Sequence, residues 1–178
     1  SDEVQEQLDL AYSPPDGVDD GLATLDVYRV DDGQQRPLVL LVHGGSWVGG
    51  DKSNFGSSAP DFIPWWIERG YVVAAVNFRL ASPLGQALEV GPRDQARDIA
   101  HALAWLDERG EELGIAPEGT VAVGYSSGAH LVIRRVVHDA AGVPGCRGDD
   151  AVELVERALH APETSSRECG GDVAGPGG

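Results

Sequence analysis

The chain has 178 residues, 42% of them hydrophobic, and a formal net charge of −16 at pH 7. This length and apolar content are typical of one soluble globular domain and argue against a disordered chain. The acidic excess argues against binding to nucleic acid or to an anionic membrane surface, since phosphates would be repelled. No apolar run approaches the roughly 20 residues of a membrane-spanning helix, so we expect no membrane span.

The methionine, lysine and cysteine content bears on the cellular compartment and on metal binding. The chain begins at Ser1, has no methionine and has one lysine, Lys52. The scarcity of lysine is compatible with genome composition or with a salt-adapted surface. The missing initial methionine fits a processed or trimmed chain or a fragment, so a cytoplasmic protein and a secreted protein without its signal peptide both stay open. Cys146 and Cys169 have no metal-ligand spacing; two free thiols are the simpler interpretation, and a disulfide stays open.

The first half of the chain predicts strands separated by a helix. Residues 22–30 alternate apolar and polar side chains, which predicts an edge or half-buried strand. The run 37–42 is continuously apolar and ends in glycines, which is typical of a strand buried on both faces. Residues 60–70 predict a helix with Asp61 as its N-cap. Residues 71–80 predict a second buried strand.

The second half continues this alternation. Apolar residues recur at spacings of three and four between Pro92 and Arg109, which predicts an amphipathic helix. Residues 120–126 predict a strand, and 127–138 predict a helix. Strands that alternate with helices predict an α/β fold with a mostly parallel sheet and helices on its faces.

The end of the chain has a different composition. Residues 141–178 are rich in glycine and proline and contain one helix-like patch with a capping box at Asp150 and Glu153. We therefore expect residues 1–140 to form the N-terminal part of a domain, followed by an atypical and partly disordered tail.

Ser126 lies between Gly124 and Gly128 in "VGYSSGAH", after a predicted strand and before a predicted helix. This is the spacing and context of a nucleophile elbow. We expect a strained backbone at the serine, because a sharp turn must lift its hydroxyl above the sheet. We also expect side chains at positions 124 and 128 to collide with the neighbouring strand and helix. A glycine-rich turn without catalytic function is the alternative.

A second glycine cluster, "LVHGGSW", ends an earlier predicted strand. Gly44 and Gly45 let backbone N–H groups face a substrate oxyanion, and the N–H group of Ser127 would be a further donor. Trp47 adjoins this loop and is a candidate for lining an acyl pocket. A phosphate-binding loop is the rival interpretation, but neither cluster has the Gly-x-Gly-x-x-Gly or Gly-Lys-Ser/Thr pattern.

Four segments in register within residues 22–133, "HGGSW", "VNFRLAS", "DQARDIAHALAWL" and "VGYSSGAHL", resemble the α/β-hydrolase superfamily. They are most similar to esterases and lipases with an HGG oxyanion motif, near feruloyl or acetyl-xylan esterase-like proteins and kynurenine formamidases. The resemblance implies a serine hydrolase that cleaves a small-molecule ester or amide through an acyl-enzyme, without a metal or cofactor. It makes Ser126 the nucleophile and surrounds the oxyanion with the N–H groups of Gly44, Gly45 and Ser127.

The triad partners of this family do not match this chain. In the family, an Asp or Glu and then a His follow the nucleophile after further strands. No such strand follows Ser126, so we expect a chain truncated after the elbow helix. His130 lies one helical turn beyond Ser126 and is a poor candidate base. His160 with Asp149 or Asp150 would preserve the order of a triad, although capping explains Asp150 more simply.

Other residues are expected to have structural roles. His43 would support the HGG loop, and Arg79 would anchor a loop through hydrogen bonds. Asp94 and Asp98 would cap or pair along their own helix. Trp65 and Trp66 would be core and surface of one helix.

Three functions therefore stay open: a serine esterase, a degenerate hydrolase-like protein that only binds acyl ligands, and one half of a split hydrolase. The third requires a complementing chain or a homo-oligomer to cover the sheet edge at strand 120–126.

Overall fold

The computed structural model describes residues 3–12, 21–81 and 90–133. Contacts between residues divide the chain into the units Ser1–Val132 and Ile133–Gly178, and the first of these is described below. The expected boundary near residue 140, the tail over 141–178 and both cysteines lie outside the described residues.

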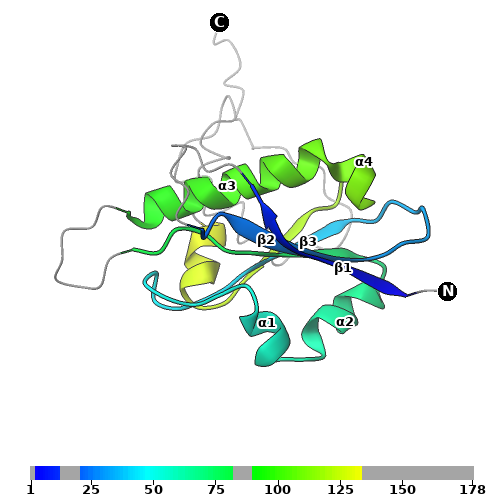
Figure 1. The fold of residues 1–178 in the computed structure, drawn as a ribbon. Helices are drawn as coiled ribbons and strands as arrows, with labels where there is room; N and C mark the ends of the chain where they lie inside the picture. Colours follow the sequence, from blue (N-terminus) through cyan, green and yellow to red (C-terminus); the bar gives the residue numbers. More distant parts are fainter. Residues whose placement is uncertain (1–2, 13–20, 82–89, 134–178) are drawn as a thin grey trace, which may run out of the picture. The chain divides into compact units, whose positions relative to one another are not determined.

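One sheet of five strands organises this unit, in the spatial order β1-β2-β4-β3-β5 (Figure 1). The strands are β1 (Val4–Ala11), β2 (Thr24–Val30), β3 (Leu38–Val42), β4 (Val72–Val76) and β5 (Val121–Gly124). β3 pairs in parallel with β4 and β5, whereas β2 pairs antiparallel with β1 and β4. The predicted α/β architecture is confirmed, with a sheet that is mixed rather than parallel throughout.

The N-terminal side of the sheet differs from the sequence prediction. β1 was not indicated by the pattern, because nearly all of its side chains are exposed or half-buried and they form no apolar face. β1 covers the outer side of β2, so the expectation of an edge strand over residues 22–30 is wrong, whereas the alternative of a half-buried strand agrees with the burial of β2. Leu25, Asp26 and Val27 are all buried, which places the first half of β2 inside the molecule.

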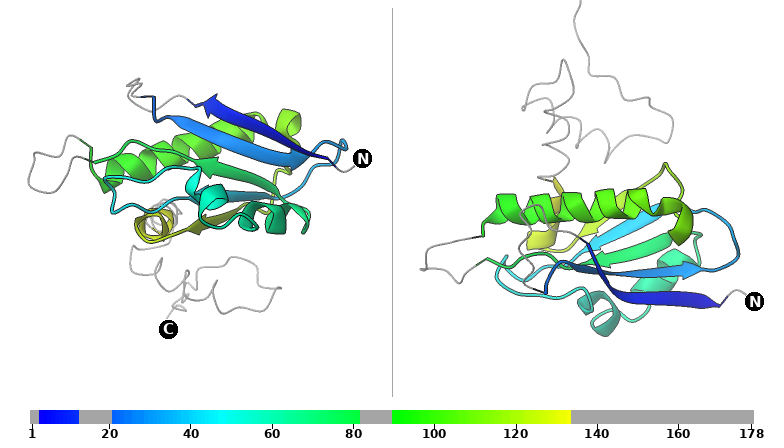
Figure 2. Two further views of the ribbon diagram at one scale, coloured as in Figure 1. Left: turned by 60° about the horizontal axis from the view of Figure 1, so that its bottom comes forward. Right: turned by 45° about the horizontal axis from the view of Figure 1, so that its top comes forward.

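Helices cover both faces of the sheet (Figures 1 and 2). α3 (Pro92–Glu108) and α4 (Gly110–Leu113) lie on one face, and α1 (Asn54–Ser57) and α2 (Phe62–Ile67) lie on the other. All five residues of β3 are buried, and alternate ones join two different apolar clusters. One cluster includes Ile99 and Leu106 of α3, and the other includes Ile63 and Ile67 of α2. The continuous apolar run of β3 is explained by this two-sided burial.

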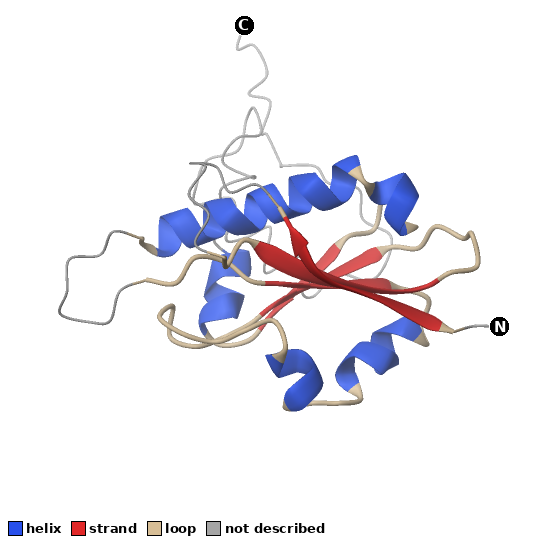
Figure 3. Cartoon of the chain, in the orientation of Figure 1, coloured by secondary structure: helices blue, strands red, loops and turns tan. Residues whose placement is uncertain are grey.

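The helix boundaries follow the predicted ranges with local differences. Asp61 occupies the N-cap position of α2, but its side chain makes no capping hydrogen bond. In α3 the expected capping by Asp94 is confirmed, since its carboxylate accepts the N–H group of Gly91 at 2.9 Å. A further helix begins at residue 127, after β5 (Figure 3). None of the helices described is long and apolar enough to cross a membrane.

Candidate active site

The two glycine-rich motifs meet at the carboxyl ends of β3 and β5. These strands are parallel neighbours with Val42 opposite Gly124, so the loops that follow them leave the sheet at the same edge. The N–H group of Tyr125 donates to the carbonyl oxygen of Val42 at 3.1 Å. A Cβ atom added to Gly44 would lie 3.2 Å from Cβ of Ser126. The sheet therefore brings the HGG loop into contact with the serine, although the two motifs are far apart in sequence.

Ser126 lies in a sharp turn and is exposed. Its φ angle is +52°, a left-handed conformation that is uncommon for a residue with a side chain. The turn is closed by the N–H group of Gly128, which donates to the carbonyl oxygen of Tyr125 at 2.9 Å. Strained residues of this kind persist where the surrounding structure fixes them, and they cluster at functional sites. The strain expected at the serine is confirmed.

The glycines that flank Ser126 are required by close packing. A Cβ atom on Gly124 would lie 2.5 Å from the backbone of Gly128 and Ala129. One on Gly128 would overlap the carbonyl oxygen of Val42 and lie 2.5 Å from that of His43. Both predicted collisions, with the helix and with the neighbouring strand, are confirmed. Because glycine carries no side chain, the helix can start directly above the end of β3.

The HGG loop leaves backbone donors beside Ser126. Gly45 has a φ angle of +134°, and its carbonyl oxygen accepts hydrogen bonds from Val48 at 3.2 Å and Gly49 at 3.0 Å. Among the hydrogen bonds between described residues, none uses the N–H groups of Gly44, Gly45 or Ser127. Ser127 lies in the first turn of its helix, where N–H groups lack an intrahelical acceptor and the dipole favours an anion.

His43 supports this loop from below. Its ring is buried and stacks on Phe78, with 4.5 Å between centroids and 10° between planes. Its Nδ1 atom, as a donor, lies 2.8 Å from the carbonyl oxygen of Gly44. Burial lowers the pKa of His43, because the charged form would lose its hydration. A neutral ring that holds the loop agrees with the role expected for His43.

Trp47 connects the loop to the rest of the domain. Its carbonyl oxygen accepts hydrogen bonds from Gln95 Nε2 at 2.7 Å and from the N–H group of Ala81 at 2.9 Å. Its ring packs against the core and meets the ring of His130 edge-on at 5.6 Å. These contacts make Trp47 an anchor of the loop, and its part in an acyl pocket stays a prediction.

No base for Ser126 is found in the part of the chain that the structure describes. His130 is exposed and its ring contacts Trp47, as expected for a residue one turn along the helix. The substitute triad of His160 with Asp149 or Asp150 lies outside the described residues. These described segments also hold no group of three or more His, Cys, Asp or Glu side chains suited to a metal ion.

An ion-paired network at the far end of the loop was not predicted from the sequence. Lys52 is buried, and its Nζ atom donates to Asp9 Oδ1 at 2.7 Å and to Asp26 Oδ1 at 2.8 Å. Its backbone N–H group donates to Asn77 Oδ1 at 2.7 Å. Asn77 Nδ2 in turn donates to Asp51 Oδ2 at 2.8 Å. A signal was present in the sequence, since the only lysine directly follows the loop that begins with the HGG motif.

A second buried ion pair joins the segment after β4 to α3. Arg79 donates from Nε to Asp98 Oδ2 at 2.9 Å and from a terminal nitrogen to Asp98 Oδ1 at 2.7 Å. The anchoring role expected for Arg79 is confirmed. The pairing expected for Asp98 along its own helix is wrong, because its buried carboxylate faces Arg79 of another segment.

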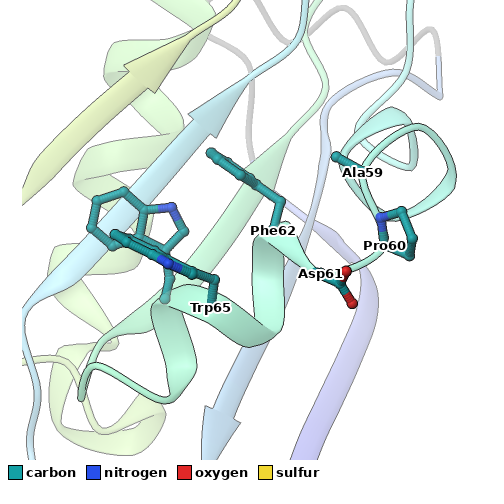
Figure 4. A pocket seen from close by; sticks show the side chains of 6 residues that line it. Ala59, Pro60, Asp61, Phe62 and Trp65 are labelled. Atoms are coloured by element: carbon teal, nitrogen blue, oxygen red, sulfur yellow. The ribbon is translucent and has the colours of Figure 1, made fainter.

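A groove of about 510 Å³ lies beside α2, and Ser126 is not among the residues that line it (Figure 4). Its lining consists of Ala59, Pro60, Asp61, Phe62, Trp65 and Trp66. Trp65 is 44% exposed and Trp66 packs against the apolar cluster of this face. One tryptophan therefore faces solvent and the other faces the core, as expected, but the expected order is wrong, because Trp65 is the exposed one.

Comparison with known proteins identifies the family of this chain. The model of the BD-FAE family matches residues 25–139, which is more than half of the chain. The chain belongs to the BD-FAE family. Structures similar to this BD-FAE chain are esterases, and the α/β-hydrolase fold implied by the sequence resemblance is confirmed.

Two solved structures illustrate the likeness. Esterase B from Lactobacillus rhamnosis, in a structure with a tributyrin phosphonate inhibitor, is 26% identical, with a TM-score of 0.62 over 77% of this chain and 41% of that chain. A bacterial heroin esterase is 28% identical, with a TM-score of 0.62 over 79% of this chain and 41% of that chain. The BD-FAE chain described here thus spans about two fifths of each.

Curated relatives include much longer proteins. The non-reducing polyketide synthase adrD of Penicillium roqueforti is 30% identical over 135 residues, which are 70% of this chain and 5% of that protein. Glutactin of Drosophila melanogaster is 31% identical over 130 residues, 71% of this chain and 12% of that protein. The BD-FAE chain therefore corresponds to a small part of either relative.

Proposed function

We propose that this chain provides the nucleophile and the oxyanion-binding loop of a serine ester hydrolase. Ser126 Oγ attacks the acyl carbon of an ester or amide, the alcohol or amine leaves with a proton, and water then hydrolyses the acyl-enzyme. The N–H groups of Gly44, Gly45 and Ser127 bind the oxygen that becomes negative at each attack. Esterases among the structural neighbours support this reaction class.

One observation carries the proposal: the strained serine lies against a loop whose backbone donors make no hydrogen bond to another described residue. The left-handed turn at Ser126 sets the direction of its Cα–Cβ bond, and the contact with Gly44 brings donors to the same place. Each donor to an oxyanion is typically worth about 3 to 4 kcal/mol of transition-state stabilisation. No metal or cofactor is needed for this chemistry.

Labelling with a fluorophosphonate tests the proposal, because the reagent phosphonylates an activated serine. We expect label on Ser126 and hydrolysis of p-nitrophenyl acetate, both lost in Ser126→Ala. Ser57→Ala, which alters an exposed serine of α1, should retain both. Absence of label that depends on Ser126 would refute a catalytic role for this chain alone.

A second candidate is one half of a split hydrolase, with the base supplied by another chain or another copy. Two observations favour it: the described residues provide no base for Ser126, and β5 pairs within the described sheet only with β3. Val121 of β5 is 40% exposed although the strand sequence is apolar. Labelling of Ser126 only above a threshold concentration of chain, or only with an added partner, would support this candidate.

A further inference from the structure

The HGG loop contains several residues whose backbone must be held in place. Gly45, Ser46, Trp47 and Gly50 all have positive φ angles, between +54° and +134°. For Ser46 and Trp47, which carry side chains, such conformations persist only where neighbouring contacts fix them. The Trp47 side of the loop is fixed by Gln95 and Ala81, so the question is what fixes its other end.

That other end is packed directly on the oxyanion donors. A Cβ atom on Gly50 would overlap the carbonyl oxygen of Gly44 and the ring of His43. The position of Gly50 therefore limits where the peptide of Gly44 can lie. Asp51 and Lys52 follow Gly50 immediately, so any group that holds them also holds Gly50.

Asp51 and Lys52 are held by a rigid part of the sheet. Asn77, directly after β4, forms side-chain hydrogen bonds with both of them. Its backbone carbonyl accepts a hydrogen bond from Tyr12 Oη at 2.7 Å, and its N–H group donates to the carbonyl oxygen of Thr24 at 2.9 Å. The ammonium group of Lys52 lies between Asp9 of β1 and the buried Asp26 of β2. The loop end is thus tied to three strands.

The charge balance explains why a lysine fits here. Asp26 is 4% exposed, and an unpaired buried carboxylate is costly, so Lys52 compensates it. A buried ion pair is nevertheless weak evidence for stability, since replacement of both partners by apolar residues of similar size often leaves the free energy of unfolding unchanged or raises it. What the pair adds is a fixed geometry between β2 and the loop.

We propose that Lys52 is a positioning residue of the active site: through Asp26 and Asp9 it fixes the loop end that packs on Gly44, and so holds the donors of Gly44 and Gly45 beside Ser126. This inference rests on the proposed function. It assigns Lys52 no contact with substrate.

The test removes the charges together, so that no buried carboxylate is left unpaired. In Lys52→Met/Asp26→Asn, we expect fluorophosphonate labelling of Ser126 to slow about 10- to 100-fold, as misplacement of catalytic groups does. The loss should fall on the maximal labelling rate, with the half-saturating probe concentration changed little. Asp9→Asn, at a position whose side chain is 77% exposed, should show a smaller loss in the same direction.

The control is an ion pair at the opposite end of β3. Arg36→Met breaks the pair of Arg36 with Asp32, which lies before β3 and away from Ser126. We expect this variant to label at the rate of the unchanged chain. Equal slowing in the control and in the double variant would overturn the proposal.

Amide hydrogen exchange provides a readout that does not depend on activity. The N–H groups of Val48 and Gly49 are hydrogen-bonded within the loop, and those of β4 within the sheet. In the double variant we expect faster exchange at Val48 and Gly49 with unchanged protection in β4. Unchanged loop exchange, or an equal loss of protection in β4, would overturn the positioning role. If the unchanged chain does not label at Ser126, the proposed function fails, and exchange still decides whether Lys52 holds the loop.

Discussion

At the scale of single residues, the site depends on glycines that a pattern search identifies and that packing explains. The flanking glycines of the elbow admit no side chain because the helix, β3 and the serine turn approach within contact distance. The sequence motif predicted these collisions, since its geometry is local. It predicted the strain at Ser126 for the same reason.

Substitution of Gly128 measures this packing. Alanine normally stabilises a helix by about 1 kcal/mol relative to glycine. In Gly128→Ala the new methyl group meets the backbone carbonyls of Val42 and His43, which do not move as a side chain would. Overpacking costs about 1 to 3 kcal/mol, so we expect a net loss of unfolding free energy in urea denaturation.

Gly56→Ala is the matched control, because Gly56 lies in α1 and a Cβ atom there meets nothing within 4 Å. This control should be neutral or stabilising. Equal stability of the two variants would show that the elbow tolerates a side chain.

At the scale of elements, α3 is held to the sheet by an apolar face and by one buried ion pair. The apolar spacing predicted the helix and its buried face, which are local properties of the sequence. The partner of Asp98 was not predictable in this way, because Arg79 lies in another segment and the pairing depends on the tertiary fold.

Asp98→Ala tests how much that ion pair contributes to the free energy of unfolding. Removal of one partner of a buried ion pair typically costs about 3 to 5 kcal/mol, a large part of the stability of a domain. We therefore expect a large fall in the urea midpoint. Arg97→Ala, which breaks an exposed contact of 4.0 Å with Asp94, should cost at most about 1 kcal/mol. Comparable losses in the two variants would contradict the assigned role of Asp98.

The strands show which features of the sheet a local sequence pattern predicts and which it does not. β3 and β4 were predicted because burial on both faces makes their sequences apolar throughout. β5 was predicted from its apolar sequence as well, although its residues are exposed or half-buried. β1 lies at the edge and is polar, so its existence depends on pairing with β2 rather than on its own composition. The antiparallel direction of β2 likewise follows from tertiary contacts.

At the scale of the whole molecule, stability should depend on pH in two steps. Burial lowers the pKa of His43 below its ordinary value of 6.5, so the unfolded chain takes up a proton more readily than the folded chain. Stability from this group is complete above pH 6.5 and declines as the pH falls below it. For Asp51, burial alone would raise the pKa, but hydrogen bonds from Asn77 and Ser53 outweigh it and lower the pKa to about 2. A second loss should therefore follow as the pH falls from 3.8, the ordinary value, towards 2.

Urea midpoints at pH 7.5 and pH 5.5 isolate the first step, since carboxylates take up protons only below this pH range. We expect a lower midpoint at pH 5.5. His43→Gln has no ring to protonate and should show a smaller difference between the two values. Midpoints that do not change with pH in the original chain would contradict a buried neutral His43.

The fold class and the geometry of the turn at Ser126 could thus be predicted, because the α/β alternation and the motif around the serine each depend on short segments of sequence. The network around Lys52 could not, since Asp9, Asp26, Lys52 and Asn77 come from four separate segments. Only the folded sheet brings their side chains together.

The burial of Lys52 also has a consequence for protein chemistry. Reagents that acylate primary amines need an accessible, unprotonated lysine, and the single lysine of this chain is neither. Burial alone would lower the pKa of Lys52, but hydrogen bonds to Asp26 and Asp9 outweigh it and raise the pKa, which keeps the amine charged. Acylation at Lys52 therefore requires the loop to open. The rate of acylation under native conditions measures how often the loop opens.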